Sequence, residues 1–123
     1  MTKAATGKAK RPAAREPSLR FHYPRELHAR SLSVLDALEG DSDPTRHRQA
    51  LAEVVLELTD AGLDYFFLRP LELADAGFVV RQSANLGMMG AKNMLSPVLR
   101  GIVGRMDAFQ LKIVAGFVRQ LME

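Results

Sequence analysis

The sequence predicts an all-α protein: a compact bundle of four main helices that follows a disordered basic tail. Three observations support this fold class. Apolar residues recur at steps of three and four along residues 24–122, which is the spacing of one helix face. No segment alternates apolar and polar residues between turn signals, so no strand is expected. Proline and glycine stand where helices are expected to begin and end.

Length and composition indicate one globular domain. The chain has 123 residues, of which 47% are hydrophobic and 25% are charged. We expect residues 1–17 to form the tail and residues 18–123 the domain. The absence of cysteine excludes a disulfide, a thiolate nucleophile and a thiolate metal site. With neither a signal-peptide pattern nor an apolar run of about 20 residues, a cytoplasmic protein is expected, and the composition is typical of a bacterial one.

Charge is concentrated at the N-terminus. Residues 1–30 hold eight Lys/Arg and two acids, a net +6, whereas residues 31–123 hold nine and twelve, a net −3, which together give the +3 of the chain. The tail has no large apolar residue after Met1, and it contains Pro12 and Pro17, so it cannot bury enough surface to fold. Such a tail attracts nucleic acid, an acidic protein or an anionic membrane, or it only raises solubility. The basic residues expected to act in this way are Lys3, Lys8, Lys10, Arg11 and Arg15.

The domain is expected to begin with a strap and a helix. Residues 18–23 alternate apolar and polar side chains and are predicted to lie across the bundle as an N-terminal strap. The first helix should run over residues 24–39, because proline suits its first position and Gly40 its end. Its apolar face is Leu27, Ser31, Val34, Leu35 and Leu38.

The second helix is expected over residues 44–61. Asp43 is a suitable N-cap, Pro44 a suitable first residue, and Gly62 is placed as the glycine that follows a helix end. The residues predicted to face inward are Leu51, Val54, Val55 and Leu58.

Two proline positions divide the second half of the chain. Residues 64–69 should form a short helical turn or kink, because Arg69 precedes Pro70. A third helix is then expected from Pro70 to Asn93. Ser96 and Pro97 should cap and begin a fourth helix that reaches Met122, with a bend at residues 104–107. The short connection predicts antiparallel neighbours.

Two stripes of glycine and alanine follow these last two helices. Each helix-interior glycine costs roughly 1 kcal/mol relative to alanine, so we expect a compensating close approach of two helix backbones. The two stripes are predicted to face each other and to make the last two helices the central pair. The triplet Asp-Ala-Gly occurs at residues 60–62 and 75–77, which we interpret as coincidence rather than as a repeat. The stripes are Ala74, Gly77, Ala84, Gly87 and Ala91, and Gly101, Gly104, Ala108 and Ala115.

The last helix carries more apolar surface than one neighbouring helix can cover. Leftover apolar surface of this kind is typical of a partner site. Five of the six methionines lie in the last 36 residues, and the adjacent Met88 and Met89 cannot both face one core. The residues predicted to form a subunit interface are Met88, Met89, Leu99, Ile102, Met106, Phe109, Ile113 and Phe117.

No motif predicts catalysis, a cofactor or a metal. The three histidines lack the i, i+4 spacing of a helical metal site. The glycines of residues 86–92 do not match a Walker A loop, and the Gly-x-x-Gly spacing of a KH loop requires strands that are not expected here. The acids near residues 60–75 suit helix ends. The chain is therefore predicted not to be an enzyme.

Three functions remain open, in order of preference. The first is a non-enzymatic interaction protein that forms a homo-oligomer, a dimer, through the last two helices. The second is a lipid- or granule-surface binder that uses the apolar face of the last helix as a peripheral contact, with Arg105, Lys112 and Arg119 opposite that face. The third is a nucleic-acid-associated regulator that uses the basic tail.

Overall fold

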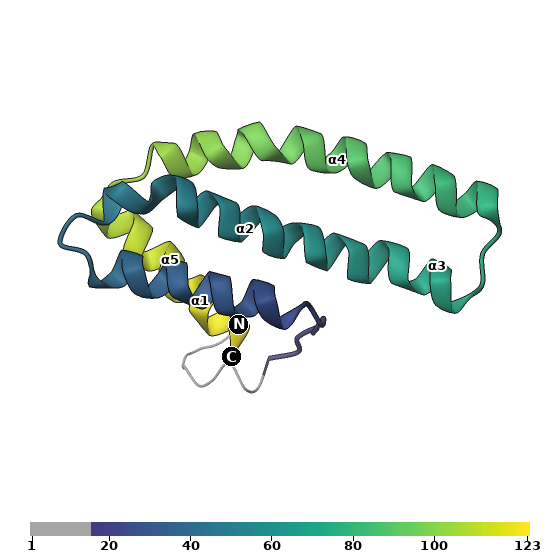
Figure 1. Cartoon of the computed structure of the whole chain (residues 1–123), viewed down its shortest axis with the longest axis horizontal. Coiled ribbons are helices and arrows are strands. Elements are labelled where there is room, and N and C mark those ends of the chain that lie inside the picture. Colours follow the sequence, from purple (N-terminus) through teal and green to yellow (C-terminus); the bar gives the residue numbers. More distant parts are fainter. Residues whose placement is uncertain (1–15) are drawn as a thin grey trace, which may run out of the picture.

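A computed structural model describes residues 16–123 and confirms the all-α fold, with no strand among these residues (Figure 1). Residues 1–15 of the tail predicted over residues 1–17 lie outside the described residues, and they include all five of the basic residues named for the tail. The four main helices are α1 (Arg25–Gly40), α2 (Arg48–Leu63), α4 (Phe78–Gly104) and α5 (Ala108–Met122). Three short elements join them: the 3-10 helix η3 (Pro44–His47), the π-helical η4 (Asp64–Leu68) and α3 (Arg69–Leu73).

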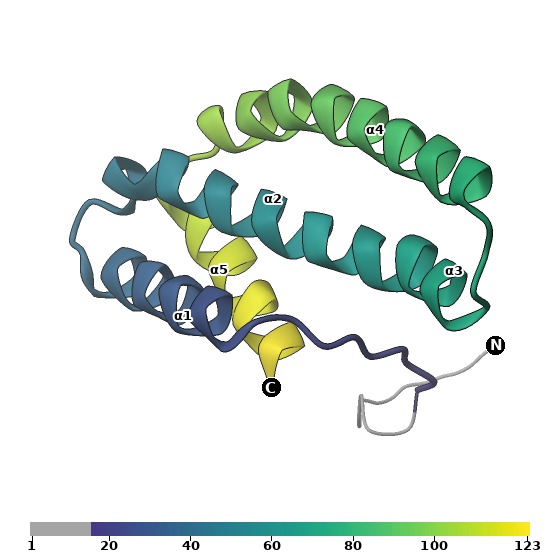
Figure 2. The same cartoon turned by 45° about the vertical axis from the view of Figure 1, so that its right-hand side comes forward.

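Three consecutive elements form one long helical column, and the other helices pack against it. The elements α2, η4 and α3 run on without a break, and α4 returns beside them over their whole length (Figures 1 and 2). α4 packs against α2 and η4, whereas α5 packs against α1, η3 and α2. The prediction that the last two helices form the central pair is therefore wrong, because the main partner of α4 is α2.

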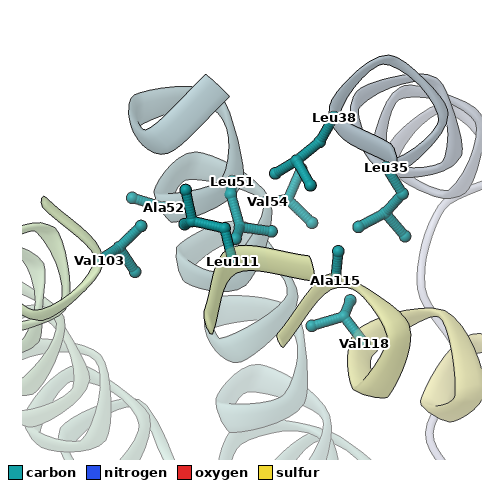
Figure 3. Packing of buried hydrophobic residues seen from close by; sticks show 9 residues of the cluster. All are labelled: Leu35, Leu38, Leu51, Ala52, Val54, Val103, Leu111, Ala115 and Val118. Atoms are coloured by element: carbon teal, nitrogen blue, oxygen red, sulfur yellow. The ribbon is translucent and has the colours of Figure 1, made fainter. Parts of the chain in front are cut away.

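The hydrophobic core lies at one end of the column. It joins side chains from all four main helices (Figure 3). The fully buried residues Leu35, Leu51 and Leu111 lie at its centre. By contrast, residues 57–102 contain no buried side chain, and we call this segment the arm. The core cluster consists of Leu35, Leu38, Leu51, Ala52, Val54, Val103, Leu111, Ala115 and Val118.

The helix start expected at Asp43 is confirmed by its cap, and Asp107 caps a helix start that the sequence did not predict. Asp43 accepts a hydrogen bond from the backbone N–H of Thr45 at 3.3 Å and so begins η3. Asp107 begins α5 with a reciprocal pair: its carboxylate accepts from the Gln110 N–H at 2.8 Å, and the Gln110 side chain accepts from the Asp107 N–H at 3.0 Å. The bend expected at residues 104–107 is thus a complete break between two helices.

The predicted strap is confirmed, but the predicted helix end at Gly62 is wrong. The chain stays helical through Gly62, and a Cβ at that position would lie 3.4 Å from the ring of Phe21. The Phe21 ring also lies against the rings of Tyr23, Tyr65 and Phe66, with centroids 5.6–6.2 Å apart. The aromatic strap therefore crosses the helix at Gly62, with the Phe21 ring within contact distance of the Cβ position, and the helix does not end there.

The turn predicted at residues 64–69 is present as the π-helical η4, and α3 begins at Arg69, one residue before Pro70, without a break in the helical path. The boundary predicted at Pro97 is wrong. Pro70 has no N–H to offer to the carbonyl one turn earlier, and the widened π-helical turn of η4 lies directly before it. Pro97 lies inside α4, which extends for 27 residues without interruption. The sequence predicts a third helix over residues 70–93 and a fourth over residues 96–122. The observed breaks between helices instead lie at residues 74–77 and 105–107.

The turn at residues 74–77 reverses the chain and places α4 beside α2. The Ala76 N–H donates to the Leu71 carbonyl at 3.0 Å, and the Asp75 N–H donates to the Glu72 carbonyl at 3.1 Å. This pair of bonds is the Schellman arrangement of a helix end. Asp75 occupies the left-handed position, with φ of 53°, that glycine usually fills. Gly77 then caps the start of α4.

The glycine and alanine stripes do not bring two helices together within the chain. A Cβ built at Gly77, Gly87, Gly101 or Gly104 would meet no atom within 4 Å. The alanines differ in their surroundings: Ala115 is in the core, Ala84, Ala91 and Ala108 are half-buried, and Ala74 is exposed. The close approach expected of these glycines therefore does not occur inside one chain, and an approach by a second chain stays a prediction.

The hydroxyl of Ser31 is buried on the core side of α1 and has no hydrogen-bond partner among the described residues. We predict that Ser31→Ala raises the free energy of unfolding by about 1 kcal/mol, because it removes an unsatisfied buried polar group. Chemical denaturation of this variant and of Ser33→Ala, an exposed serine of the same helix, separates the buried hydroxyl from helix propensity. Equal gains in the two variants would contradict the prediction.

Candidate interaction surface

The side of α4 that turns away from α2 is the candidate site, and three contacts fix its orientation. Lys92 donates to Asp64 at 2.9 Å, Arg100 pairs with Glu53, and Val103 is buried in the core. These residues therefore mark the inner side of α4. The outer face, at about 100° of rotation per residue, consists of Val79, Val80, Ser83, Leu86, Gly87, Gly90, Met94, Pro97, Val98 and Gly101, all of them exposed.

The outer face is apolar and carries no charge. Leu86 is 62% exposed, Met94 76% and Val98 55%. The charged residues of α4 are Arg81, Lys92 and Arg100, and none of them lies on this face. From Val79 to Gly101 the face is about 33 Å long at 1.5 Å per residue, and at a helix width of about 10 Å it covers roughly 330 Å² in projection. Contiguous apolar patches of this size on a monomer are often functional.

Glycines open the middle of the outer face to the backbone. A Cβ at Gly87, Gly90 or Gly101 would meet no other atom within 4 Å. The larger side chains of the outer face, such as those of Leu86 and Met94, lie next to these glycines along the helix. Another helix can therefore approach the α4 backbone closely at the glycines while it contacts the larger side chains around them.

A second exposed apolar line runs along α5, which we call the α5 ridge. It consists of Phe109, Ile113, Phe117 and Leu121 at steps of four residues, with exposed fractions of 73%, 56%, 58% and 69%. The opposite face of α5 supplies core residues such as Leu111. α5 is thus apolar on two faces, and only one of them is covered by the described residues.

The structure divides the predicted interface residues into two groups. Met89 and Ile102 of α4 are exposed, as are Phe109, Ile113 and Phe117 of the α5 ridge. The other three, Met88, Leu99 and Met106, are half-buried. The sequence-based prediction missed the outer face itself, although the positions of the three charges of α4, all off that face, were a signal that could have identified it.

The basic residues of α4 and α5 have different surroundings. Lys92 is paired with Asp64, and Arg119 donates to Asp36 and Glu39, each at 2.7 Å. These hydrogen bonds raise the pKa of Arg119 and tie α5 to α1. Arg105 and Lys112 are exposed and have no carboxylate within 4 Å among the described residues.

The histidines and acids do not converge on one site. His47 bonds to Asp41 at 2.8 Å, and His28 bonds to the Tyr23 hydroxyl at 3.0 Å, at separate places on the bundle. Burial raises the pKa of that tyrosine. Within residues 16–123 no three potential metal ligands gather. Two pockets of about 340 and 350 Å³ lie between α1 and α2 and beside η4.

Comparisons of the chain with protein-family models, curated proteins and solved structures found no match. In the part of the chain that the structure describes, no helix combines the length and apolarity required to cross a membrane. The exposed surface of α4 and α5 is therefore the basis for assigning a function.

Asp41 gives the fold a dependence on acid pH. Its pKa is lowered by the backbone N–H of Asp43, at 2.8 Å, and by the bond to His47. A lowered pKa stabilises the folded state above the unfolded-state pKa of about 4, and this contribution is lost as pH falls through the folded pKa. Asp41→Asn should therefore lower Tm at neutral pH, and the difference from the native protein should vanish in acid. Thermal unfolding across pH checks this.

The control for this measurement is Asp60→Asn, because Asp60 has no ion-pair partner among the described residues. A Tm difference for Asp41→Asn that persists unchanged at low pH would show that the carboxylate charge is not its source.

Proposed function

We propose that this chain is a non-enzymatic interaction protein that self-associates through the outer face of α4 and the α5 ridge. The observation that carries the proposal is the combination of an arm without buried side chains and a charge-free apolar surface along it. A protein that worked as an isolated monomer would leave this surface in contact with water.

The apolar surface is large enough to support association. Complete burial of an exposed Leu, Val, Met or Phe side chain contributes roughly 1.5–3 kcal/mol. The outer face and the α5 ridge together carry nine such side chains or close equivalents, five on α4 and four on α5, each at least half exposed. Their burial offsets a loss of translational and rotational freedom of about 4–15 kcal/mol.

The distribution of charge favours a helix partner over a strongly charged one. Lys92 points toward η4 and Arg100 toward α2, where Asp64 and Glu53 already pair with them. No charged residue of α4 is left on the outer face to recognise an acidic or basic partner. Shape and apolar contact therefore govern recognition at this surface.

Charge introduced on these surfaces should abolish association while the fold is kept. We expect Leu86→Asp and Ile113→Asp each to weaken self-association by about 2 kcal/mol or more, because each places a charge in the proposed interface. This free energy corresponds to roughly a thirtyfold increase in Kd. Both side chains are more than half exposed, so the monomer should remain helical. Light scattering across a range of protein concentrations, with circular dichroism as the test of folding, measures this effect.

Asn85→Asp is the matched control, because it adds the same charge to α4 at an exposed position off the outer face. A native protein that stays monomeric at every concentration would overturn the proposed function, as would equal weakening by all three variants.

A further inference from the structure

The outer face of α4 contains one line of residues with the spacing of a coiled-coil seam. From Val80 onward, exposed residues follow one another at alternating steps of three and four, which is the spacing along which one helix packs on another. None of them is charged, and each of the three glycines has open space where a Cβ would be. The seam consists of Val80, Ser83, Gly87, Gly90, Met94, Pro97 and Gly101.

The order of side-chain sizes along the seam is complementary to itself when it is reversed. About a centre at Gly90, the large Met94 comes opposite Gly87, and Pro97 comes opposite Ser83. At the ends, Val80 comes opposite Gly101. In a two-fold interface the same residues occur on both sides, so a surface must complement itself in this way.

We propose that α4 packs antiparallel against α4 of a second copy of this chain, about a two-fold axis at Gly90. This inference rests on the proposed self-association and specifies its surface and direction. Each layer on either side of the axis then places a larger side chain of one copy on a small residue of the other, whereas at the axis Gly90 meets Gly90 of the second copy. The dipoles of two antiparallel helices also lie in their favourable relative direction.

Parallel pairing fits the same residues poorly. Each residue would meet its own copy, so Met94 would meet Met94 while Gly87 would meet Gly87. The large pairs would hold the helices apart where the glycine pairs leave empty space, and such voids lose packing contacts. The antiparallel arrangement has no layer that pairs two large side chains, and its one glycine pair is the central Gly90 layer.

The outer side of α4 has room for a second helix. In both views no other element of the chain lies over the side of α4 opposite α2 (Figures 1 and 2). The ten residues of the outer face are flanked by four more exposed residues, fourteen together: Gln82, Met89, Asn93 and Ile102. A standard interface has roughly 20–30 residues a side, so we expect a dimer that dissociates on dilution.

A second helix explains the seam better than a lipid surface does. Apolar lipid contact is strengthened by large side chains, with Lys and Arg at the flanks. The seam instead has glycine or serine at four of its seven positions, Ser83, Gly87, Gly90 and Gly101. These small residues contribute little apolar area, but they admit a helix backbone.

Single cysteines test the register, because the native chain contains no cysteine. Gly90→Cys should form a disulfide between two copies under mild oxidation, because residues at the axis lie within the Cα separation of about 4.4–6.8 Å that a disulfide needs. Gly87→Cys and Met94→Cys should each remain reduced alone, since their own copies are offset by about 9 Å or more along the helix. Mixed together, these two variants should form the hetero-disulfide.

The control is Gly40→Cys, at an open and exposed position at the end of α1 and on neither proposed surface, which should not cross-link. Mass spectrometry of the oxidised mixtures identifies each linkage. Homo-disulfides of both Gly87→Cys and Met94→Cys would indicate parallel helices and overturn the proposal.

A size exchange tests the packing without cross-linking. Gly87→Met and Met94→Gly should each weaken the dimer by about tenfold, through overfilling and through loss of a contact. The double variant Gly87→Met with Met94→Gly restores one large and one small residue in each layer, so dimerisation should recover. Light scattering gives the mass, and circular dichroism shows that each variant remains helical.

The remaining outcomes separate this inference from the proposed function. A native dimer whose affinity none of the exchanges alters would place the interface elsewhere, for example on the α5 ridge; the inference would fail and the proposed function would stand. A native protein that is monomeric throughout would overturn both. If that monomer floated with anionic vesicles, the outer face would be a lipid contact instead.

Discussion

The architecture depends on one constraint: a single neighbouring helix covers only a narrow part of the surface of the helix it packs against. α4 packs only along the column of α2 and η4 for most of its length, and a helix with one neighbour buries a single stripe of its surface. The core that joins all four main helices lies at one end, and only Val103 of α4 is buried there. Beyond that point α4 is held by one line of contact and by the ion pairs of Lys92 and Arg100.

Two local devices set that line of contact. The π-helical turn before Pro70 keeps α2 and α3 in one column, so the column is long enough to accompany all of α4. The left-handed Asp75 then ends α3 and reverses the chain within four residues. An aspartate pays less strain in this conformation than most side chains, so the turn forms without glycine. The π-helical turn and the turn at Asp75 together leave the outer face exposed, because no other described element packs on that side of α4 (Figures 1 and 2).

The sequence predicted the helical class, the strap, the Asp43 cap and the apolar face of α1, because each of these features depends on residues close together in the chain. It did not predict the boundaries of the second half. The triplet Asp-Ala-Gly is helical at 60–62 and forms the turn at 75–77, so the triplet alone does not determine its structure. At Gly62 the helix continues under the distant Phe21 ring, a contact that local sequence does not predict. At Pro97 the packing of α4 on α2 outweighs the local preference for a break. The partner of each helix is likewise a tertiary property, so the exposed outer face could not be separated from core by spacing alone.

The glycines of α4 connect this architecture to the proposed function. Gly87, Gly90 and Gly101 lie inside a continuous helix, where each is less favourable than alanine by roughly 1 kcal/mol. Alanine would fit at every one of them, because no atom of the described chain lies within 4 Å of the Cβ position. Folding of one chain therefore gives no reason for glycine at these positions. The proposed approach of a second backbone would give one, since glycine lets two helices come closest. In the proposed dimer, Val80 and Met94 fill the spaces that Gly101 and Gly87 leave on the second copy, while Gly90 lies at the axis.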